Sequence, residues 1–348
     1  SQNTSKALNM ASDISPLSHL AFPSNDAPAV AEISKKFTVV GHRGSGMNML
    51  QSSDRRMVAI RENTIASFNS ASRFRVDFIE FDVQVTKDNI PVVFHDDFIV
   101  TENNGVVSET RVTSLTLSEF LSYGPQRDGA KVMKPMLRST REGSPVRWDV
   151  EEDDHLCTLQ EAFQKVEPSL GFNIELKFDD FVRYSNRQIL RALRATLQVV
   201  WEFGKGRPIF FSSFNPDAAL LVRKLQSRYP VFFLTNGGTE VFADERRNSV
   251  DEGIRVCCEG ELQGIVSDVR GVLSDPGVVK KMKDCNLEIF TYGHLNNKTE
   301  AVYKQYLMGV DGVVVDLVQE VSAAVEKFSS PYSYCSKLLD LRKYHTRQ

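Results

Sequence analysis

Charged residues two positions apart occur in two apolar segments of this chain. Glu80 and Asp82 flank Phe81 in one segment, and Glu175 stands two positions before Lys177 in the other. Residues two positions apart in a β-strand point to the same face, so each pair would lie on one face of its strand. Carboxylates that meet in a buried place repel one another unless a cation lies between them, and oxygen ligands favour a hard ion. We therefore expect one divalent cation at Glu80, Asp82 and Glu175, Mg²⁺ first and Ca²⁺ as the alternative.

Two histidines stand at the ends of further apolar segments. His42 follows residues 37–41, and His95 follows residues 91–94. Imidazole titrates near neutral pH, so this pair could transfer protons on either side of a reacting centre. Arg43 and Lys177 would add fixed positive charge beside the cation. Together these groups describe a site for an anionic substrate such as a phosphate ester.

Short β-branched or aromatic segments alternate with amphipathic helical stretches from residue 37 onwards. The predicted strands are residues 37–41, 78–82, 91–94, 172–177, 208–212, 231–234, 264–267, 287–291 and 312–316. The turn at 86–89 is too short for a parallel crossover, so the second and third strands must form an antiparallel hairpin. The other eight strands, with helices between them, predict an α/β fold of the (β/α)₈ TIM-barrel type. A doubly wound open sheet is the alternative, but its third phosphate-turn glycine is absent after the first strand.

The domain organisation follows from segments that break this alternation. Residues 1–36 are polar and predict a disordered or loosely docked extension, residues 37–330 the barrel domain, and residues 331–348 a C-terminal tail. Residues 98–157 contain one predicted helix, at 116–123, and are far longer than an ordinary βα loop. We expect this segment to be a hydrophilic insertion that caps the C-terminal mouth of the barrel, where TIM-barrel enzymes place their active sites.

Five short motifs lie at or near the predicted strand ends and helix starts: Gly41-His42-Arg43-Gly44, Glu62-Asn63-Thr64, Glu80-Phe81-Asp82-Val83, Val93-Phe94-His95-Asp96 and Glu175-Leu176-Lys177. Together they resemble the glycerophosphodiester phosphodiesterase family, in particular its plant and eukaryotic intracellular branch. The resemblance covers residues 37–325. It implies metal-dependent hydrolysis of glycerophosphodiesters, such as glycerophosphocholine and glycerophosphoethanolamine, to sn-glycerol 3-phosphate and an alcohol.

The resemblance also implies roles for individual residues. His42 and His95 would be the general acid and base, Arg43 and Lys177 would contact the phosphate, and the three acids would hold the metal. Glu62 would orient Arg43. Tyr292 stands near the position where many members carry a tryptophan in the glycerol pocket, so it would keep an aromatic wall there.

Composition excludes several other classes of protein. The chain has 348 residues with 42 Lys+Arg and 45 Asp+Glu, and no basic run exceeds two residues, which argues against nucleic-acid binding. No apolar stretch reaches the roughly 18 residues that a membrane span needs. The five cysteines form neither a disulfide framework nor paired zinc-ligand spacing, so we expect reduced thiols in an intracellular compartment. The plant resemblance favours a plastid, with the cytosol as the alternative, and the oligomeric state is left open.

Two other functions compete with the diesterase. A lysophospholipase D on the same scaffold would need an apolar entry patch or a membrane anchor. A catalytically silent binding protein would be expected to have lost a histidine or a metal ligand, and here none is lost. Asp96-Asp97 could extend the metal site. His294 has no acidic motif beside it in the sequence, so we expect it to be structural.

Overall fold

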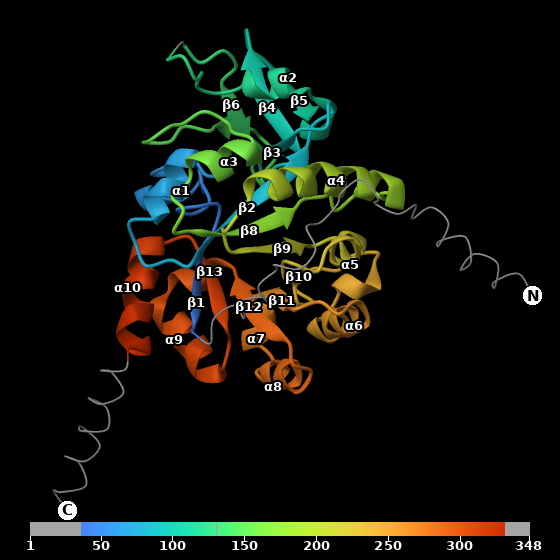
Figure 1. The fold of residues 1–348 in the computed structure, drawn as a ribbon. Coiled ribbons are helices and arrows are strands. Elements are labelled where there is room, and N and C mark those ends of the chain that lie inside the picture. The colour runs from blue at the N-terminus through green and yellow to red at the C-terminus, as the bar shows by residue number, and fades with distance from the viewer. Residues whose placement is uncertain (1–35, 130, 331–348) are drawn as a thin grey trace, which may run out of the picture. The chain divides into compact units, whose positions relative to one another are not determined.

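A closed barrel of eight parallel strands forms the centre of the computed structural model, which describes residues 36–129 and 131–330 (Figure 1). Each strand pairs with the next, and β1 pairs with both β2 and β13, which closes the sheet. The barrel strands are β1 (Thr38–Gly41), β2 (Phe78–Val85), β8 (Gly171–Leu176), β9 (Ile209–Ser213), β10 (Val231–Thr235), β11 (Gly264–Asp268), β12 (Glu288–Tyr292) and β13 (Gly312–Val315). The predicted TIM-barrel fold is confirmed, and so is the hairpin, because β3 (Pro91–Val93) pairs antiparallel with β2.

Helices surround the outside of this barrel, as Figure 1 shows. They are α1 (Ile65–Ala71), α3 (Leu159–Lys165), α4 (Asn186–Phe203), α5 (Pro216–Leu225), α6 (Val250–Gly260), α7 (Val269–Leu273), α8 (Gly277–Asp284), α9 (Thr299–Met308) and α10 (Val318–Ser329). Short 3₁₀ turns lie at Arg55–Val58, Val112–Ser114, Glu245–Arg247 and His294–Asn297. Thr158 begins α3 with a capping box, and Asn215 caps α5 ahead of a proline at its first position, so local sequence signals fix these helix starts.

The barrel strands are apolar on both faces because each face packs against something different. Phe211 and Phe233 belong to the large core cluster between the strands and the helices. Residues of the opposite face, inside the barrel, contact one another, with ring centroids 5.0 to 5.8 Å apart: Phe78, Phe210, Phe232 and Phe290. We call these four residues the phenylalanine layer. Two positions further along these strands stand Glu80, Ser212, Leu234 and Tyr292, which all line the cavity described below, so this layer lies beneath the site.

The insertion is a folded unit with a sheet of its own. Its antiparallel strands, in the order β5-β4-β6-β7, are β4 (Phe98–Asn103), β5 (Val106–Arg111), β6 (Met136–Arg138) and β7 (Val146–Arg147). The predicted helix is present as α2 (Leu117–Leu121), but the four strands were not predicted. A second apolar cluster, which includes Phe94, Phe120 and Trp148, supports this unit.

Other expectations concern segments at the ends of the chain. The predicted extension 1–36, apart from Lys36, and the predicted tail 331–348 lie outside the described residues, so these boundaries stay predictions.

In the described part of the chain, no helix combines the length and the apolar character needed to cross a membrane. The four cysteines of that part are all free thiols.

Candidate active site

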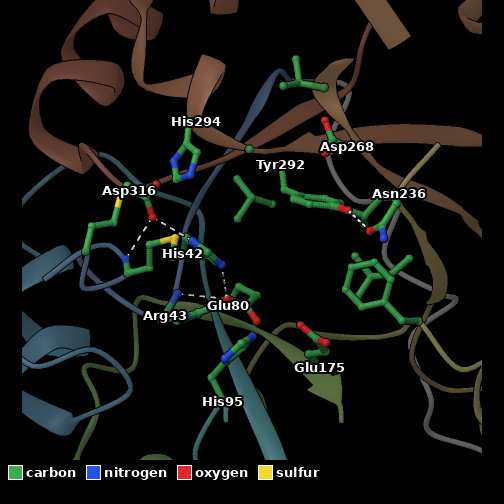
Figure 2. A pocket seen from close by; sticks show the side chains of 18 of the residues that line it. His42, Arg43, Glu80, His95, Glu175, Asn236, Asp268, Tyr292, His294 and Asp316 are labelled. Atoms are coloured by element: carbon green, nitrogen blue, oxygen red, sulfur yellow. Dashed lines mark hydrogen bonds and ion pairs between the residues drawn. The ribbon is translucent and has the colours of Figure 1, made fainter. Parts of the chain in front are cut away.

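A cavity of about 1000 Å³ opens at the carboxyl ends of the barrel strands (Figure 2). Seven of the residues singled out in the sequence line it: His42, Arg43, Glu80, His95, Glu175, Lys177 and Tyr292. Residues 138–141 of the insertion line it as well, which agrees with the predicted capping of the mouth. Asp82 and Glu62 are buried next to Arg43. The fold therefore brings all nine residues, which span positions 42 to 292, to one place.

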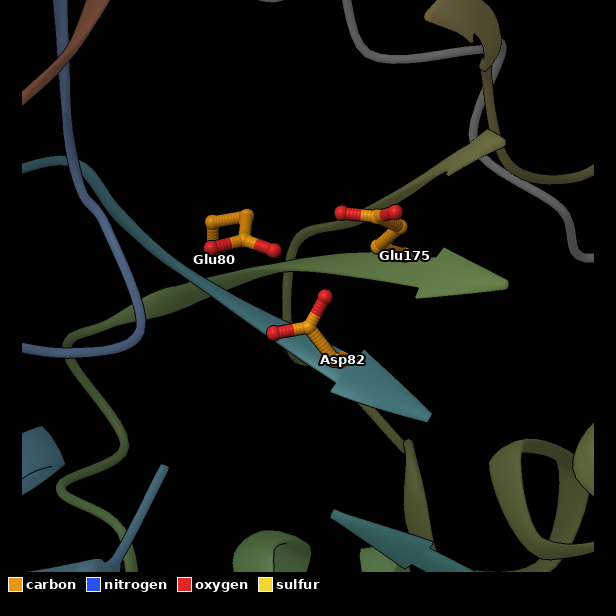
Figure 3. A group of neighbouring side chains, drawn as sticks. All are labelled: Glu80, Asp82 and Glu175. Carbon is orange, nitrogen blue, oxygen red and sulfur yellow. The ribbon is translucent and has the colours of Figure 1, made fainter. Parts of the chain in front are cut away.

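The three acids form one buried cluster, shown in Figure 3. Glu80, Asp82 and Glu175 each offer an oxygen within 4.8 Å of the others. The register of the parallel strands brings the acids together, because Asp82 on β2 lies opposite Glu175 on β8. Each acid is less than a tenth exposed.

The cluster has the properties expected of a cation site. Oε1 of Glu80 and Oδ1 of Asp82 are buried and have no hydrogen-bond partner among the described residues. Burial and the charge of Asp82 raise the pKa of Glu80 and of Glu175 above the ordinary carboxyl value. Burying unpaired carboxylates is costly, and a divalent cation would offset that cost. These three residues could therefore hold a metal ion.

His42 is oriented by an acid at the end of the last barrel strand. Its Nδ1 lies 2.8 Å from Oδ1 of Asp316. This oxygen also accepts a hydrogen bond from the backbone N–H of Met47, and Oδ2 of Asp316 accepts one from Nδ2 of Asn297. Burial alone would raise the pKa of Asp316, but the charge of His42 and these hydrogen bonds lower it. With Nδ1–H donating to Asp316, Nε2 of His42 faces the acidic cluster, 3.9 Å from Oε2 of Glu80.

His95 has the same kind of support on the other side of Glu80 in Figure 2. Its Nδ1 lies 2.8 Å from Oδ1 of Asp96, the next residue. Loss of hydration and the charges of Arg43 and Lys177 lower the pKa of His95 to about 4. Both histidines thus present Nε2 to the cavity while a carboxylate holds Nδ1, the arrangement that fixes a tautomer for proton transfer.

The two cations lie beside the acidic cluster. The backbone N–H of Arg43 donates to Oε2 of Glu80, and its Nη1 donates to Oε2 of Glu62 at 2.8 Å. Nε of Arg43 is buried without a hydrogen-bond partner in the described part of the chain. Burial alone would lower the pKa of Lys177, but Glu175 and Asp82 raise it, so this side chain stays charged.

Tyr292 forms part of the opposite wall of the cavity. Its hydroxyl donates to Oδ1 of Asn236 at 2.6 Å, and its ring meets Phe214 edge to face, with centroids 5.9 Å apart. Burial raises the pKa of the hydroxyl well above its ordinary value, so it stays protonated. The cavity therefore has an aromatic wall on the side away from His95 (Figure 2).

The structure adds residues that the sequence analysis missed. Asp96 does not join the metal cluster as considered, because its carboxylate pairs with His95 and with Arg138. Asp316 ends a predicted strand, so its place at the barrel mouth was a usable signal. Two residues that the sequence analysis did name also line the cavity: His294, which was expected to be structural, and Asp97, which is not one of the three clustered acids. Arg138 carried no signal, because nothing in the sequence fixes where the insertion folds back.

Comparisons with known proteins point to one family of enzymes. The profile of the Glycerophosphoryl diester phosphodiesterase family matches residues 42–320. An Arabidopsis thaliana protein named glycerophosphodiester phosphodiesterase GDPD1, chloroplastic, is 58% identical over 329 residues, which cover 94% of this chain and 90% of that protein. Glycerophosphodiester phosphodiesterase GDPD2 of the same plant is 61% identical over 285 residues, which cover 82% and 76%.

Solved structures share the fold at low sequence identity. A glycerophosphodiester phosphodiesterase from Parabacteroides distasonis superposes with a TM-score of 0.59 at 20% identity, covering 85% of this chain and 99% of that one. An Oleispira antarctica phosphodiesterase in complex with the product sn-glycerol 3-phosphate gives a TM-score of 0.57 at 22% identity, covering 83% and 96%. The solved structures show the fold, and the family profile with the plant relatives shows that the chain belongs to the glycerophosphoryl diester phosphodiesterase family of enzymes.

Proposed function

We propose that this protein hydrolyses glycerophosphodiesters, such as glycerophosphocholine and glycerophosphoethanolamine, to sn-glycerol 3-phosphate and an alcohol. One observation carries the proposal: the acidic cluster and two carboxylate-supported histidines line the same cavity. The names of the Arabidopsis relatives support the substrate class, and so does the product found in the Oleispira structure. A cavity of about 1000 Å³ has room for a diester with a small headgroup.

In this proposal each residue has a defined task. Glu80, Asp82 and Glu175 would hold one divalent cation, Mg²⁺ in preference to Ca²⁺, whose charge lowers the cost of negative charge on the phosphoryl group. Arg43 lines the cavity, with Nε 3.7 Å from Oδ2 of Asp82, so its charge would attract the phosphate, and Lys177 adds a second fixed charge.

Proton transfer is assigned to the two histidines. One imidazole, at Nε2, accepts the proton of the attacking hydroxyl group, and the other donates a proton to the oxygen of the departing alcohol. Asp316 and Asp96 hold the rings so that Nε2 points into the cavity. The resemblance to the family makes the glycerol 2-hydroxyl the attacking group, with hydrolysis of a cyclic phosphate to follow.

Removing divalent metal should abolish turnover. The purified protein is incubated with glycerophosphocholine, with and without chelator, and sn-glycerol 3-phosphate is measured. We expect loss of product with chelator and recovery when Mg²⁺ is added back, with Ca²⁺ tested in parallel. Metal at about 100 times its dissociation constant should also stabilise the fold by about 2.7 kcal/mol, visible as a higher Tm. Full activity in chelator would contradict the assigned role of the acids.

A lysophospholipase D is the second candidate because the insertion is not hydrophilic throughout. Five large apolar side chains of the insertion are exposed: Val106, Val107, Val132, Met133 and Val146. Exposed apolar side chains suit contact with an acyl chain, and residues 138–141 of the same insertion line the cavity. Lysophosphatidylcholine in the same assay separates the two activities, since choline release from it at a rate similar to glycerophosphocholine would favour the second.

For the compartment we propose a plastid, because the Arabidopsis relative that matches over most of both chains is named chloroplastic. Expression of the full-length coding sequence with a C-terminal fluorescent protein in leaf cells tests this. Signal confined to the cytosol would support the alternative.

A further inference from the structure

Arg138, at the end of β6 in the insertion, is built into the active site of the barrel domain. Its guanidinium donates to both oxygens of Glu62, at 2.7 and 2.9 Å, and to both oxygens of Asp96, at 3.0 and 3.1 Å. A fifth hydrogen bond, of 3.2 Å, goes to the backbone carbonyl of Asn48. The side chain is only 12% exposed, and its guanidinium carbon lies 3.7 Å from the centre of the Trp148 ring. These five hydrogen bonds depend on the planar guanidinium group of arginine, and the ammonium group of lysine could not form all of them.

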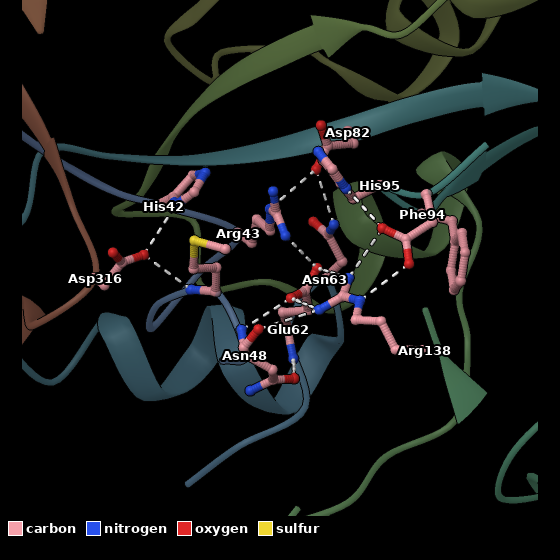
Figure 4. Close-up of polar contacts among 12 residues, drawn as sticks. His42, Arg43, Asn48, Glu62, Asn63, Asp82, Phe94, His95, Arg138 and Asp316 are labelled. Carbon is pink, nitrogen blue, oxygen red and sulfur yellow. Dashed lines mark hydrogen bonds and ion pairs between the residues drawn. The ribbon is translucent and has the colours of Figure 1, made fainter. Parts of the chain in front are cut away.

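The partners of Arg138 are the residues that hold the proposed catalytic groups. Glu62 binds Nη1 of Arg43, and Asp96 binds Nδ1 of His95. Figure 4 shows Arg138 beside Glu62, with Arg43 and His95 above them in the view. The insertion thus contributes one side chain that joins the proposed phosphate-binding arginine to a proposed proton-transfer histidine.

The charge of Arg138 also keeps Glu62 and Asp96 ionised. Glu62 and Asp96 are acids for which burial alone would raise the pKa, and in both cases the charge of Arg138 is the largest opposing influence. The pKa of each is lowered as a result, so both remain carboxylates. Without Arg138 two negative groups would share a poorly hydrated space. Among the described residues, the carboxylate of Asp96 would keep only its contact with His95, whereas Glu62 would keep the hydrogen bonds from Arg43 and from the backbone N–H of Asn48.

We propose that Arg138 is a positioning residue for the phosphodiesterase reaction, which holds Asp96 against His95 and Glu62 against Arg43 and so makes the insertion part of the active site. The inference rests on the proposed function for its kinetic consequence, but its structural consequence, the pairing of His95 with Asp96, can be measured without substrate. The insertion therefore sets the geometry of catalysis in addition to bounding the cavity.

The variant Arg138→Lys tests this, because it keeps the positive charge and removes the fork. We expect kcat on glycerophosphocholine to fall by about 10- to 100-fold, the range for partners that orient reacting groups. KM should change less, because the phosphate contacts of Lys177 and the metal remain. Added metal should raise the Tm of this variant as it does for the native protein. In a protein with ¹⁵N-labelled histidine, the Nδ1–H signal of His95, assigned by its absence in His95→Gln, should shift or broaden.

Arg127→Lys is the matched control. Arg127 also lies in the insertion and pairs with a carboxylate through two nitrogens, but its partners are Glu161 and the carbonyl of Leu156, outside the cavity. This variant should keep kcat and the His95 signal even if its Tm falls. Native kcat and an unchanged His95 signal in Arg138→Lys would overturn the inference, and so would an equal loss of kcat in Arg127→Lys. If the native protein lacked activity on every diester, the proposed function would fail, while the His95 signal would still decide the role of Arg138.

Discussion

Replacing His42 with alanine should lower kcat by about 10²- to 10⁴-fold, the usual contribution of a general acid or base. The fold should survive, because Asp316 keeps hydrogen bonds from the backbone N–H of Met47 and from Asn297 after the imidazole is gone. Steady-state kinetics measure the first effect. Thermal unfolding with and without metal measures the second, and we expect the metal-induced rise in Tm to persist.

His155→Ala is a suitable control for this experiment. Its side chain is 23% exposed, nearly the same as the 22% of His42, and its Nδ1 contacts the carbonyl of Leu156. His155 does not line the cavity. Activity close to native in His155→Ala and retained activity in His42→Ala would together show that proton transfer at this site does not depend on His42.

Glu175→Gln should abolish the response to metal and at the same time stabilise the metal-free protein. The substitution removes one of three converging charges at nearly constant shape, so we expect at least a hundredfold weaker metal binding, about the largest loss found for supporting partners. Without metal, the same change removes repulsion between buried carboxylates, and the Tm should rise. Calorimetric titration with Mg²⁺ and thermal unfolding in chelator measure the two effects.

The second effect should depend on pH in a defined direction. Burial, and after it the charge of Asp82, raise the pKa of Glu175 in the folded protein from its ordinary value of 4.5 to about 8. Between those two values the folded protein binds more protons than the unfolded chain, so its free energy of unfolding falls as pH rises. The advantage of Glu175→Gln in chelator should therefore grow as pH increases from about 5 toward neutrality.

A cavity acid outside the cluster provides the comparison. Glu240 lines the same cavity but binds Nδ2 of Asn236 and is not among the three clustered acids. Glu240→Gln should leave both metal binding and the metal-free Tm close to native. A metal-free Tm that falls in Glu175→Gln would mean that this carboxylate stabilises the fold, contrary to the repulsion inferred from the cluster.

The barrel could be predicted from sequence because its strands are doubly buried. Residues 209–211 and 231–234 are continuous apolar runs, the pattern that parallel strands covered on both faces require. The short strands of the insertion have no such pattern. β5 is largely exposed, and β6 and β7 have three and two residues, too few to show a period.

The site residues likewise include some that the sequence predicts and some that it does not. Glu80, Asp82 and Glu175 share strand faces, so their spacing predicts their meeting, and the cluster is where we expected it. Arg138 reaches Glu62 across 76 residues and Asp96 across 42, through a chain path set by the packing of the insertion. Tertiary contacts of this kind leave no local trace, so only coordinates reveal them.

The phenylalanine layer determines how ligands move in and out of this protein. Its four rings fill the barrel interior below the acids, so substrate and products exchange with solvent through the end rimmed by residues 138–141. The released alcohol has to diffuse past the insertion before the next diester can enter. Changes on this rim could thus alter the escape of products while the bond-breaking step keeps its own rate.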